Sequence, residues 1–411
     1  MAQPQRSKRR PRSIVVCGLA GLVALVAALA ITVGPLTRAQ ATEANAPVQL
    51  TLPEPTGPHR IGTVSLHLID RTRTDPFVPD QRTREIMVQL WYPAARTAGY
   101  PTAPWLSPGA VPHFEASNGL PPGAVRLPRT HGHVGAPVLP GRDPVLVYSP
   151  SFGGDRGFAT AQVEDLASYG YIVVTVDHTH DASEVEFPDG RVETATIADA
   201  DDTLIAEAVA VRAADVRFVL DALATIAAGG NPDAEHHRLP HGLAGALDLR
   251  RVGVFGHSLG GAAAAAAIRT DPRIRAGVNM DGTLFGPDGV AGSDRPFLLL
   301  SSDHPTIPED PTWDELFANQ QGPILELRLV GSAHLSFNDG QLLYPQVAGV
   351  LGLGPDDLVA LVGSINPQRS LAVQRRYLRA FFDHYLRQRR EPLLAGPSPR
   401  FPEIQFVRSG P

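Results

Sequence analysis

The chain has 411 residues, a length that suits one large domain or two of ordinary size, and 43% of them are hydrophobic, enough for a sizeable core. Removing the six positive charges of residues 1–41, which contain no acid, from the net charge of −6 leaves −12 for the remainder. An acidic body disfavours nucleic acid as a partner and charge-driven attachment to anionic membranes. The single cysteine, Cys17, lies in the first 41 residues, so the remainder has no disulfide and no cysteine metal site.

Residues 1–41 have the composition of an export leader. A basic run from Arg6 to Arg12 precedes an apolar stretch at 14–33, and Ala-Gln-Ala at 39–41 offers a cleavage site. The apolar stretch of 20 residues is long for a signal peptide and long enough to span a bilayer. We therefore expect either a cleaved signal peptide or a retained N-terminal anchor, with the catalytic domain secreted or otherwise outside the cytoplasm.

The next hundred residues combine two strands with two irregular segments. Residues 42–59 are polar and rich in proline, which predicts a linker. Alternating apolar residues predict strands at 61–68 and 86–92, at the start of a catalytic domain spanning 60–411. Residues 93–142 show no clear period and many prolines and glycines. We expect a long loop insertion there, either over the active-site mouth or as a disordered segment.

From residue 143 onward, strand and helix patterns alternate. Apolar runs predict strands at 145–148, 172–176, 252–255, 277–280, 297–300 and 324–330, and helical spacing predicts helices at 203–227 and 371–386. This alternation is typical of an α/β fold with a mostly parallel central sheet and helices on both faces.

The segment Gly256-His257-Ser258-Leu259-Gly260-Gly261 lies between a predicted strand and six alanines at 262–267. A strand, a Gly-x-Ser-x-Gly turn and a helix form the nucleophile elbow of the α/β-hydrolase fold. Glycine permits the sharp turn that exposes the serine hydroxyl. The bare pattern is weak, but this context predicts a serine hydrolase with Ser258 as the nucleophile.

A serine nucleophile needs a base and an acid, which follow it along the chain in this fold. His334 lies in the loop after the last predicted strand, where the fold delivers its catalytic histidine. Asp281 and Asp303 each end a predicted strand, and the residues alone do not separate them as the acid. His257 is expected to pack beside the nucleophile.

The reaction also needs two N–H donors for an oxyanion. The fold supplies one from the residue after the nucleophile, Leu259, and one from the loop at 149–154, where we expect Phe152 to donate. Histidine-containing clusters at 131–133, 177–181 and 236–237 lack metal-site spacing and are expected to be solvated loop residues. No metal or other cofactor is expected.

The chain resembles the platelet-activating factor acetylhydrolase family of the plasma or isoform II type, within the α/β-hydrolases, from about residue 61 to the C-terminus. The motifs that carry the resemblance lie at 87–93, 165–170, 256–261, 279–282 and 331–337. The resemblance implies that Asp281, rather than Asp303, is the acid. Pro150 departs from the histidine that relatives commonly carry, but the expected donor at Phe152 is unaffected.

The resemblance further implies a serine carboxylic-ester hydrolase acting on lipid esters with a short or oxidised acyl chain, like 1-alkyl-2-acetylglycerophosphocholine esterase. Two alternatives stay open: a polyester or small-ester hydrolase like cutinase or dienelactone hydrolase, and a catalytically inactive exported binding protein. The expected partner is a small lipid or ester, with transient contact to a lipid surface. The apolar segment 342–353 is expected either to serve the acyl chain or lipid surface, or to pack in the core.

Overall fold

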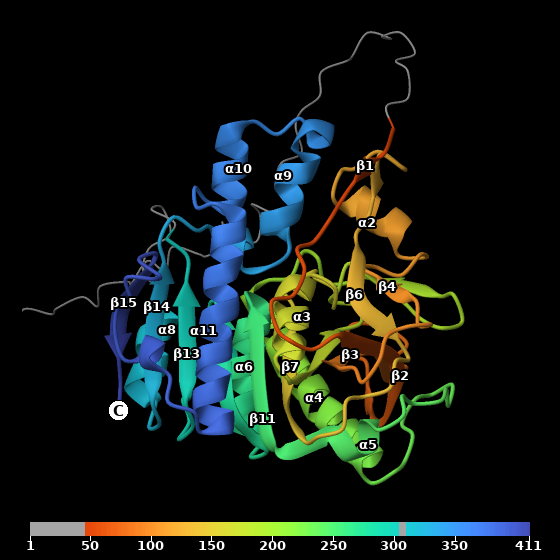
Figure 1. Cartoon of the computed structure of the whole chain (residues 1–411), viewed down its shortest axis with the longest axis horizontal. Helices are drawn as coiled ribbons and strands as arrows, with labels where there is room; N and C mark the ends of the chain where they lie inside the picture. The colour runs from red at the N-terminus through yellow and green to blue at the C-terminus, as the bar shows by residue number, and fades with distance from the viewer. Residues whose placement is uncertain (1–45, 304–309) are drawn as a thin grey trace, which may run out of the picture. The chain divides into compact units, whose positions relative to one another are not determined.

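An 11-stranded sheet organises the described part of the chain, which comprises residues 46–303 and 310–411 of the computed structural model. The leader expected at 1–41 and the first residues of the expected linker lie outside the described residues. Residues 46–411 form one compact unit, which includes the whole sheet. Figure 1 shows its strands and the helices around them.

Six neighbouring strands of this sheet run parallel, and the flanking strands are mostly antiparallel. The parallel set is β14 (Ile324–Leu329), β13 (Phe297–Ser301), β12 (Ile274–Met280), β11 (Leu247–His257), β7 (Asp143–Ser149) and β8 (Ile172–Asp177). Beside β14 lies β15 (Ile404–Ser409), and beyond β8 follow β3 (Thr83–Pro93), β2 (Ile61–Thr74), β6 (Arg129–Val134) and β4 (Thr102–Pro104). The predicted strands and the mostly parallel sheet are therefore confirmed.

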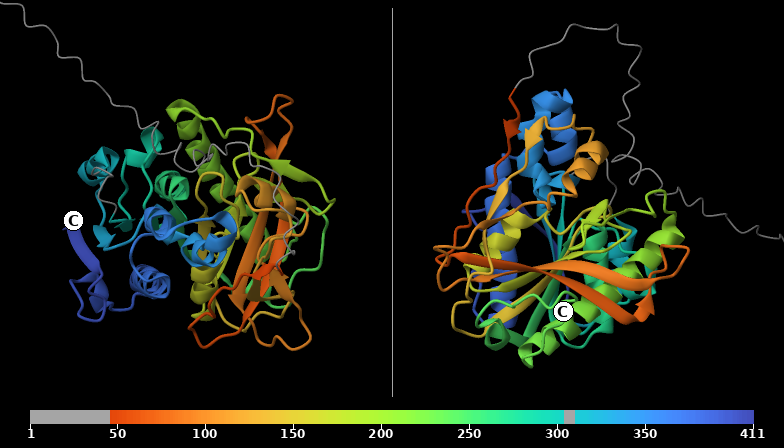
Figure 2. Two further views of the ribbon diagram at one scale, coloured as in Figure 1. Left: turned by 90° about the horizontal axis from the view of Figure 1, so that it is seen from above. Right: turned by 90° about the vertical axis from the view of Figure 1, so that its right-hand side faces the viewer.

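Helices cover both faces of the sheet because its central strands are apolar on both sides. On one face α4 (Asp202–Ala227) and α6 (Leu259–Thr270) pack against Val145, Val147 and their neighbours. On the other face α3 (Thr160–Ser168) and α11 (Pro367–Arg387) pack against Leu146 and Tyr148. Figure 2 shows the two layers of helices with the sheet between them.

Residues 93–142 do not form the long loop that their composition predicts. They contain β4, α2 (Val111–Ser117), β5 (Val125–Arg126) and β6. Trp105 and Phe114 from this segment join a buried apolar cluster with Leu342, Leu343 and Val347 of α9 (Gly340–Leu351). Contacts with distant parts of the chain stabilise these short elements, so no period marks them in the sequence.

Residues 46–59 are part of the domain rather than a linker. Within them β1 (Val48–Gln49) pairs with β5, and Leu50 and Leu52 are buried. The N–H of Thr56 donates to Asp165 at 2.8 Å. Proline-rich composition therefore reflects an extended segment that packs along the surface of the domain.

The remaining elements are short. They are β9 (Glu184–Glu186), β10 (Val192–Thr194), α5 (Leu243–Ala246), α7 (Gly286–Val290), α8 (Pro311–Asn319), α10 (Pro355–Val362) and 3₁₀ turns at His334–Phe337 and Pro392–Leu394. Among residues 46–303 and 310–411, no helix combines the length and apolar character needed to cross a bilayer.

Candidate active site

Ser258 occupies a sharp turn between β11, which ends at His257, and α6, which begins at Leu259. Its backbone angles, φ 56° and ψ −124°, lie in a region that non-glycine residues seldom adopt and that is found at functional sites. A Cβ at Gly260 would lie 1.9 Å from the carbonyl oxygen of Ser149, so only glycine fits there. The backbone therefore has the form of a nucleophile elbow.

Asp281 and His334 are joined by a direct hydrogen bond. The distance from His334 Nδ1 to Asp281 Oδ2 is 2.7 Å, and the N–H of Ser302 donates to Asp281 Oδ1, also at 2.7 Å. Burial alone would raise the pKa of Asp281, but the hydrogen bonds from His334 and Ser302 lower it below its ordinary value. An ionised Asp281 fixes the proton of His334 on Nδ1, which leaves Nε2 as an acceptor.

Asp303 makes different contacts. Its Oδ2 accepts from the N–H of Gly331 at 2.9 Å, and its own N–H donates to the carbonyl of Ser332 at 3.2 Å. Asp303 therefore stabilises the loop that leads to His334, and the structure brings Asp281, not Asp303, to the imidazole.

His257 connects the elbow to the histidine loop. Its ring lies 4.6 Å from the ring of His334, and its Nε2 donates to the His334 carbonyl oxygen at 2.9 Å. Burial lowers the pKa of His257 to about 3, so the residue is neutral at physiological pH. His257 thus packs beside the nucleophile, as expected, and holds the backbone of His334.

Two backbone connections hold Ser258 near the Asp281–His334 pair. The N–H of Ser258 donates to the carbonyl of Met280, the residue before Asp281, at 2.9 Å. The preceding residue, His257, donates to the carbonyl of His334. In the described part of the chain, the Ser258 hydroxyl makes no hydrogen bond of its own.

Two unused amides are present at the expected oxyanion site. Among the described residues, the N–H groups of Phe152 and Leu259 donate to no acceptor. Leu259 is the first residue of α6, where helix N–H groups lack partners and the helix dipole favours negative charge. Phe152 lies in the turn after β7, where the N–H of Gly154 donates to Ser151 at 2.9 Å. Strand pairing of Ser149 with Gly256 holds this turn beside the elbow.

The apolar segment 342–353, expected to serve the acyl chain or a lipid surface or to pack in the core, contributes mostly core residues. Leu342, Leu343 and Val347 are buried against Trp105 and Phe114. Trp105 also donates from Nε1 to Asp339 at 3.0 Å, which ties residues 93–142 to the segment that follows His334.

Two of the histidines expected to be solvated are buried. His178 and His180 are only 1% and 3% exposed and take part in ion pairs and hydrogen bonds. His237 is exposed, and its ligand atom lies within 4.8 Å of those of Asp233 and Glu235. Asp233 already accepts from backbone N–H groups of His67 and His237, so its carboxylate is satisfied within the loop.

A cavity of about 560 Å³ lies away from Ser258. Its lining includes Ala95 and Arg96, which follow the end of β3. β3 runs antiparallel to β8, and β8 is parallel to β7, β11 and β12. The end of β3 therefore lies near the amino ends of these parallel strands, whereas Ser258 and Asp281 follow the carboxyl ends of β11 and β12. The cavity is therefore separate from the site.

The sheet order and the elbow are those of the α/β-hydrolase fold, and the Asp–His pair lies where that fold places its catalytic histidine. Residues 44–392 match the family described as platelet-activating factor acetylhydrolase, isoform II, and the chain belongs to this family.

Individual relatives agree with this class. The chain is 28% identical over 403 residues to a probable 1-alkyl-2-acetylglycerophosphocholine esterase of Arthroderma benhamiae, covering 90% of this chain and 97% of the relative. It is 22% identical over 373 residues to a platelet-activating factor acetylhydrolase of Cavia porcellus, covering 82% and 78%. A solved ferulic acid esterase from Streptomyces cinnamoneus superimposes with a TM-score of 0.75 at 36% identity, covering 87% and 99%. The protein is a carboxylic-ester hydrolase.

Proposed function

We propose that Ser258 is the nucleophile, His334 the general base and Asp281 the acid that orients His334. The observation that carries this proposal is the 2.7 Å hydrogen bond between Asp281 and His334, beside the strained backbone of Ser258. A strained serine on a strand–helix turn, and an imidazole that carries its proton on Nδ1 so that Nε2 can accept one, are the parts that acyl transfer needs.

The reaction follows from these roles. The Ser258 hydroxyl attacks the acyl carbon while His334 Nε2 takes its proton, and the carbonyl oxygen becomes an oxyanion bound by the N–H groups of Phe152 and Leu259. Collapse of this intermediate breaks the ester bond, and the leaving alcohol takes the proton from His334. Water then attacks the acyl-enzyme by the same route and releases the acid.

For the substrate we propose a lipid ester with a short or oxidised acyl chain. The family and the fungal relative named as a 1-alkyl-2-acetylglycerophosphocholine esterase, which aligns over nearly its whole length, support this class. Transient contact with a lipid surface would accompany it, and Val359 of α10, 49% exposed, offers apolar surface for that contact.

A small ester is the second candidate. The ferulic acid esterase has the higher sequence identity to this chain, which favours a compact aromatic or other small ester, and polyesters belong to the same alternative. A catalytically inactive binding protein is the third. Export, either as a secreted enzyme or by an N-terminal anchor, is proposed from the basic and apolar segments at 6–33 and the Ala-Gln-Ala sequence after them.

A panel of esters assayed with purified protein tests the proposal. The panel contains a short-chain phospholipid, a long-chain phospholipid, a feruloyl ester and a polyester film, with Ser258→Ala as the control. We expect the largest kcat/KM on the short-chain phospholipid. Feruloyl ester or film turned over without phospholipid would support the second candidate, and no turnover by folded protein would support the third.

A further inference from the structure

The peptide group between Ser151 and Phe152 carries the N–H that is expected to bind the oxyanion. On the opposite side of this peptide, Nη2 of Arg212 from α4 donates to the Ser151 carbonyl at 3.1 Å, and Nη1 donates to the carbonyl of Pro150. The peptide is planar and trans, so its C=O and N–H point in opposite directions. Holding the carbonyl toward Arg212 therefore aims the Phe152 N–H away from α4. We propose that Arg212 is a positioning residue for the oxyanion site.

Arg212 is itself rigidly held. Its Nε and Nη2 donate to the two carboxylate oxygens of Asp181 at 2.6 and 2.5 Å, and both side chains are buried. Asp181 Oδ1 also lies 3.5 Å from the N–H of Gly153. This buried, bidentate ion pair thus contacts the Ser151 carbonyl on one side of Phe152 and the Gly153 N–H on the other. Two such contacts restrict the turn more than a single hydrogen bond would.

A second set of contacts holds Arg212 through the side chain of Ser149. Ser149 Oγ lies 2.9 Å from Nε2 of His178, and Nδ1 of His178 lies 2.9 Å from Asp215. Burial lowers the pKa of His178 to about 4, so its single proton is on Nδ1 and Nε2 accepts from Ser149. The Ser149 oxygen then accepts from Arg212 Nη1 at 3.3 Å. Since Ser149 is fully buried, this Ser–His–Asp chain supports the turn and does not react with substrate.

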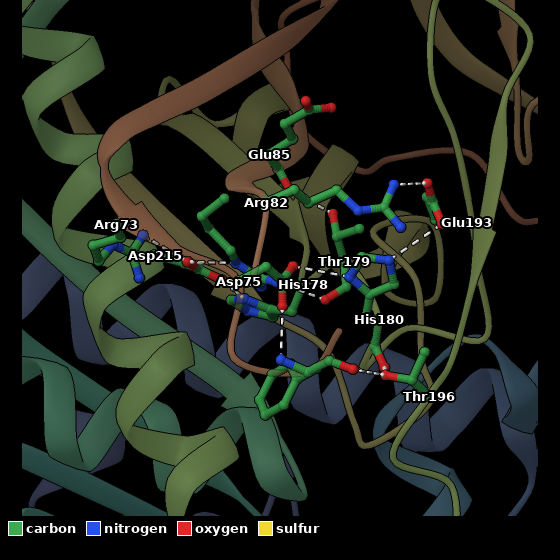
Figure 3. A network of polar contacts seen from close by, with 12 residues as sticks. Arg73, Asp75, Arg82, Glu85, His178, Thr179, His180, Glu193, Thr196 and Asp215 are labelled. Carbon is green, nitrogen blue, oxygen red and sulfur yellow. Dashed lines mark hydrogen bonds and ion pairs between the residues drawn. The ribbon is translucent and has the colours of Figure 1, made fainter. Parts of the chain in front are cut away.

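The network continues from Asp215 of α4 to Arg84 of β3. Arg84 donates to Asp215 at 2.7 Å and to Asp75 at 2.7 Å, and Asp75 lies 2.8 Å from His180. Figure 3 shows how Asp215, Asp75, His178 and His180 converge in one network. Each charged group in it has an opposite charge or a hydrogen bond, as buried charges require. The oxyanion turn is therefore connected through Arg212 to residues of β3 and its neighbouring loops.

Arg212 also acts on the donor strength of the amide. A cation that binds the carbonyl oxygen withdraws electron density from the same peptide, which strengthens its N–H as a hydrogen-bond donor. The benefit is largest when negative charge develops on the substrate oxygen. Loss of Arg212 should therefore lower kcat and leave KM nearly unchanged.

The inference rests on the proposed function, so the test begins with wild type and Ser258→Ala. If wild-type turnover does not depend on Ser258, the proposed function fails before Arg212 is addressed. Two variants then probe Arg212. Arg212→Lys keeps the positive charge but loses the several N–H donors of the planar guanidinium. Arg212→Gln combined with Asp181→Asn removes both charges, so that no buried charge is left unpaired. Arg375→Lys is the control, because Arg375 is also buried and donates to a backbone carbonyl, that of Ala161 in α3.

The readouts are kcat, KM, the melting temperature and the Ki of a trifluoromethyl ketone, which forms a tetrahedral adduct with an oxyanion at the serine. We expect kcat to fall about tenfold to hundredfold in the Arg212 variants, with KM within about threefold of wild type. The Ki should rise by the same factor as kcat falls. Arg375→Lys should lower the melting temperature and leave kcat and Ki within about twofold. A folded Arg212 variant with wild-type kcat and Ki would overturn the inference.

Discussion

Asp281 and His334 meet in a 2.7 Å hydrogen bond although 53 residues separate them in the sequence. Asp281 follows β12 and His334 follows β14, and β13 lies between these two strands in the sheet. Because all three strands are parallel, their carboxyl ends reach the same edge, and the loops there bridge the width of one strand. Asp281 has a positive φ of 56°, which non-glycine residues seldom adopt, and its carboxylate meets His334 of that neighbouring loop.

The first prediction separates the two candidate acids. Asp281→Asn keeps the size of the side chain but no longer fixes the His334 proton on Nδ1, so we expect kcat to fall by about 10⁴. Asp303→Asn keeps an oxygen that can accept from Gly331, and its kcat should stay within about tenfold of wild type. Steady-state kinetics on one ester decide between them, and a large loss confined to Asp303→Asn would contradict the assignment.

The second prediction concerns the close approach at the elbow. Gly260→Ala places a methyl group 1.9 Å from the Ser149 carbonyl, so the turn after β7 or α6 must shift. We expect the free energy of unfolding to fall by about 2 kcal/mol or more. Gly245→Ala in α5 is the matched control because nothing lies within 4 Å of its new Cβ, and it should be neutral or stabilising. Urea unfolding measures both, and equal effects would refute the steric argument.

The third prediction links buried His178 to pH. Burial lowers the pKa of His178 to about 4, below its value of about 6.5 in the unfolded chain. The unfolded chain therefore binds the proton first, and the stability contribution present above pH 6.5 is lost as the pH falls toward 4. The expected slope for this one group is about 1.4 kcal/mol per pH unit.

His178→Gln should remove that slope, because glutamine does not titrate. The difference in the free energy of unfolding between wild type and His178→Gln, measured by urea at intervals from pH 7 to 4, isolates this group from the buried acids. His113→Gln, at an exposed position of α2, is the control and should parallel wild type. Parallel curves for wild type and His178→Gln would show that His178 is protonated readily in the native state.

The sequence contains enough information for the sheet and for the elbow because both rest on local patterns. Apolar runs at 145–148 and 172–176 are strands buried on both faces, and the elbow requires its strand, glycines and helix in direct succession. Chain order leaves the histidines after residue 281 as candidate bases, and the position of His334 in the loop after the last predicted parallel strand selects it among them. The choice between Asp281 and Asp303 depends on which loop bends toward His334, and no local pattern encodes that bend.

Other features depend on contacts between distant residues. Within 93–142, β6 pairs with β2 of the main sheet, β4 pairs with β6, and Trp105 and Phe114 pack on α9. Residues 46–59 are held by pairing with β5 and by contacts to α3. His178 and His180 look like loop histidines in the sequence, because their buried partners Asp215 and Asp75 lie 37 and 105 residues away. Polar residues in a loop are commonly solvated, and only the fold reveals that these are not.

Covalent labelling of Ser258 tests the central claim most directly. Purified protein is treated with a fluorophosphonate, digested and analysed by mass spectrometry, with ester turnover followed in the same sample. We predict one modified site at Ser258, loss of turnover in proportion to labelling, and no labelling of folded Ser258→Ala. Folded wild-type protein that remains unlabelled, or a Ser258→Ala variant that keeps wild-type turnover, would contradict the account.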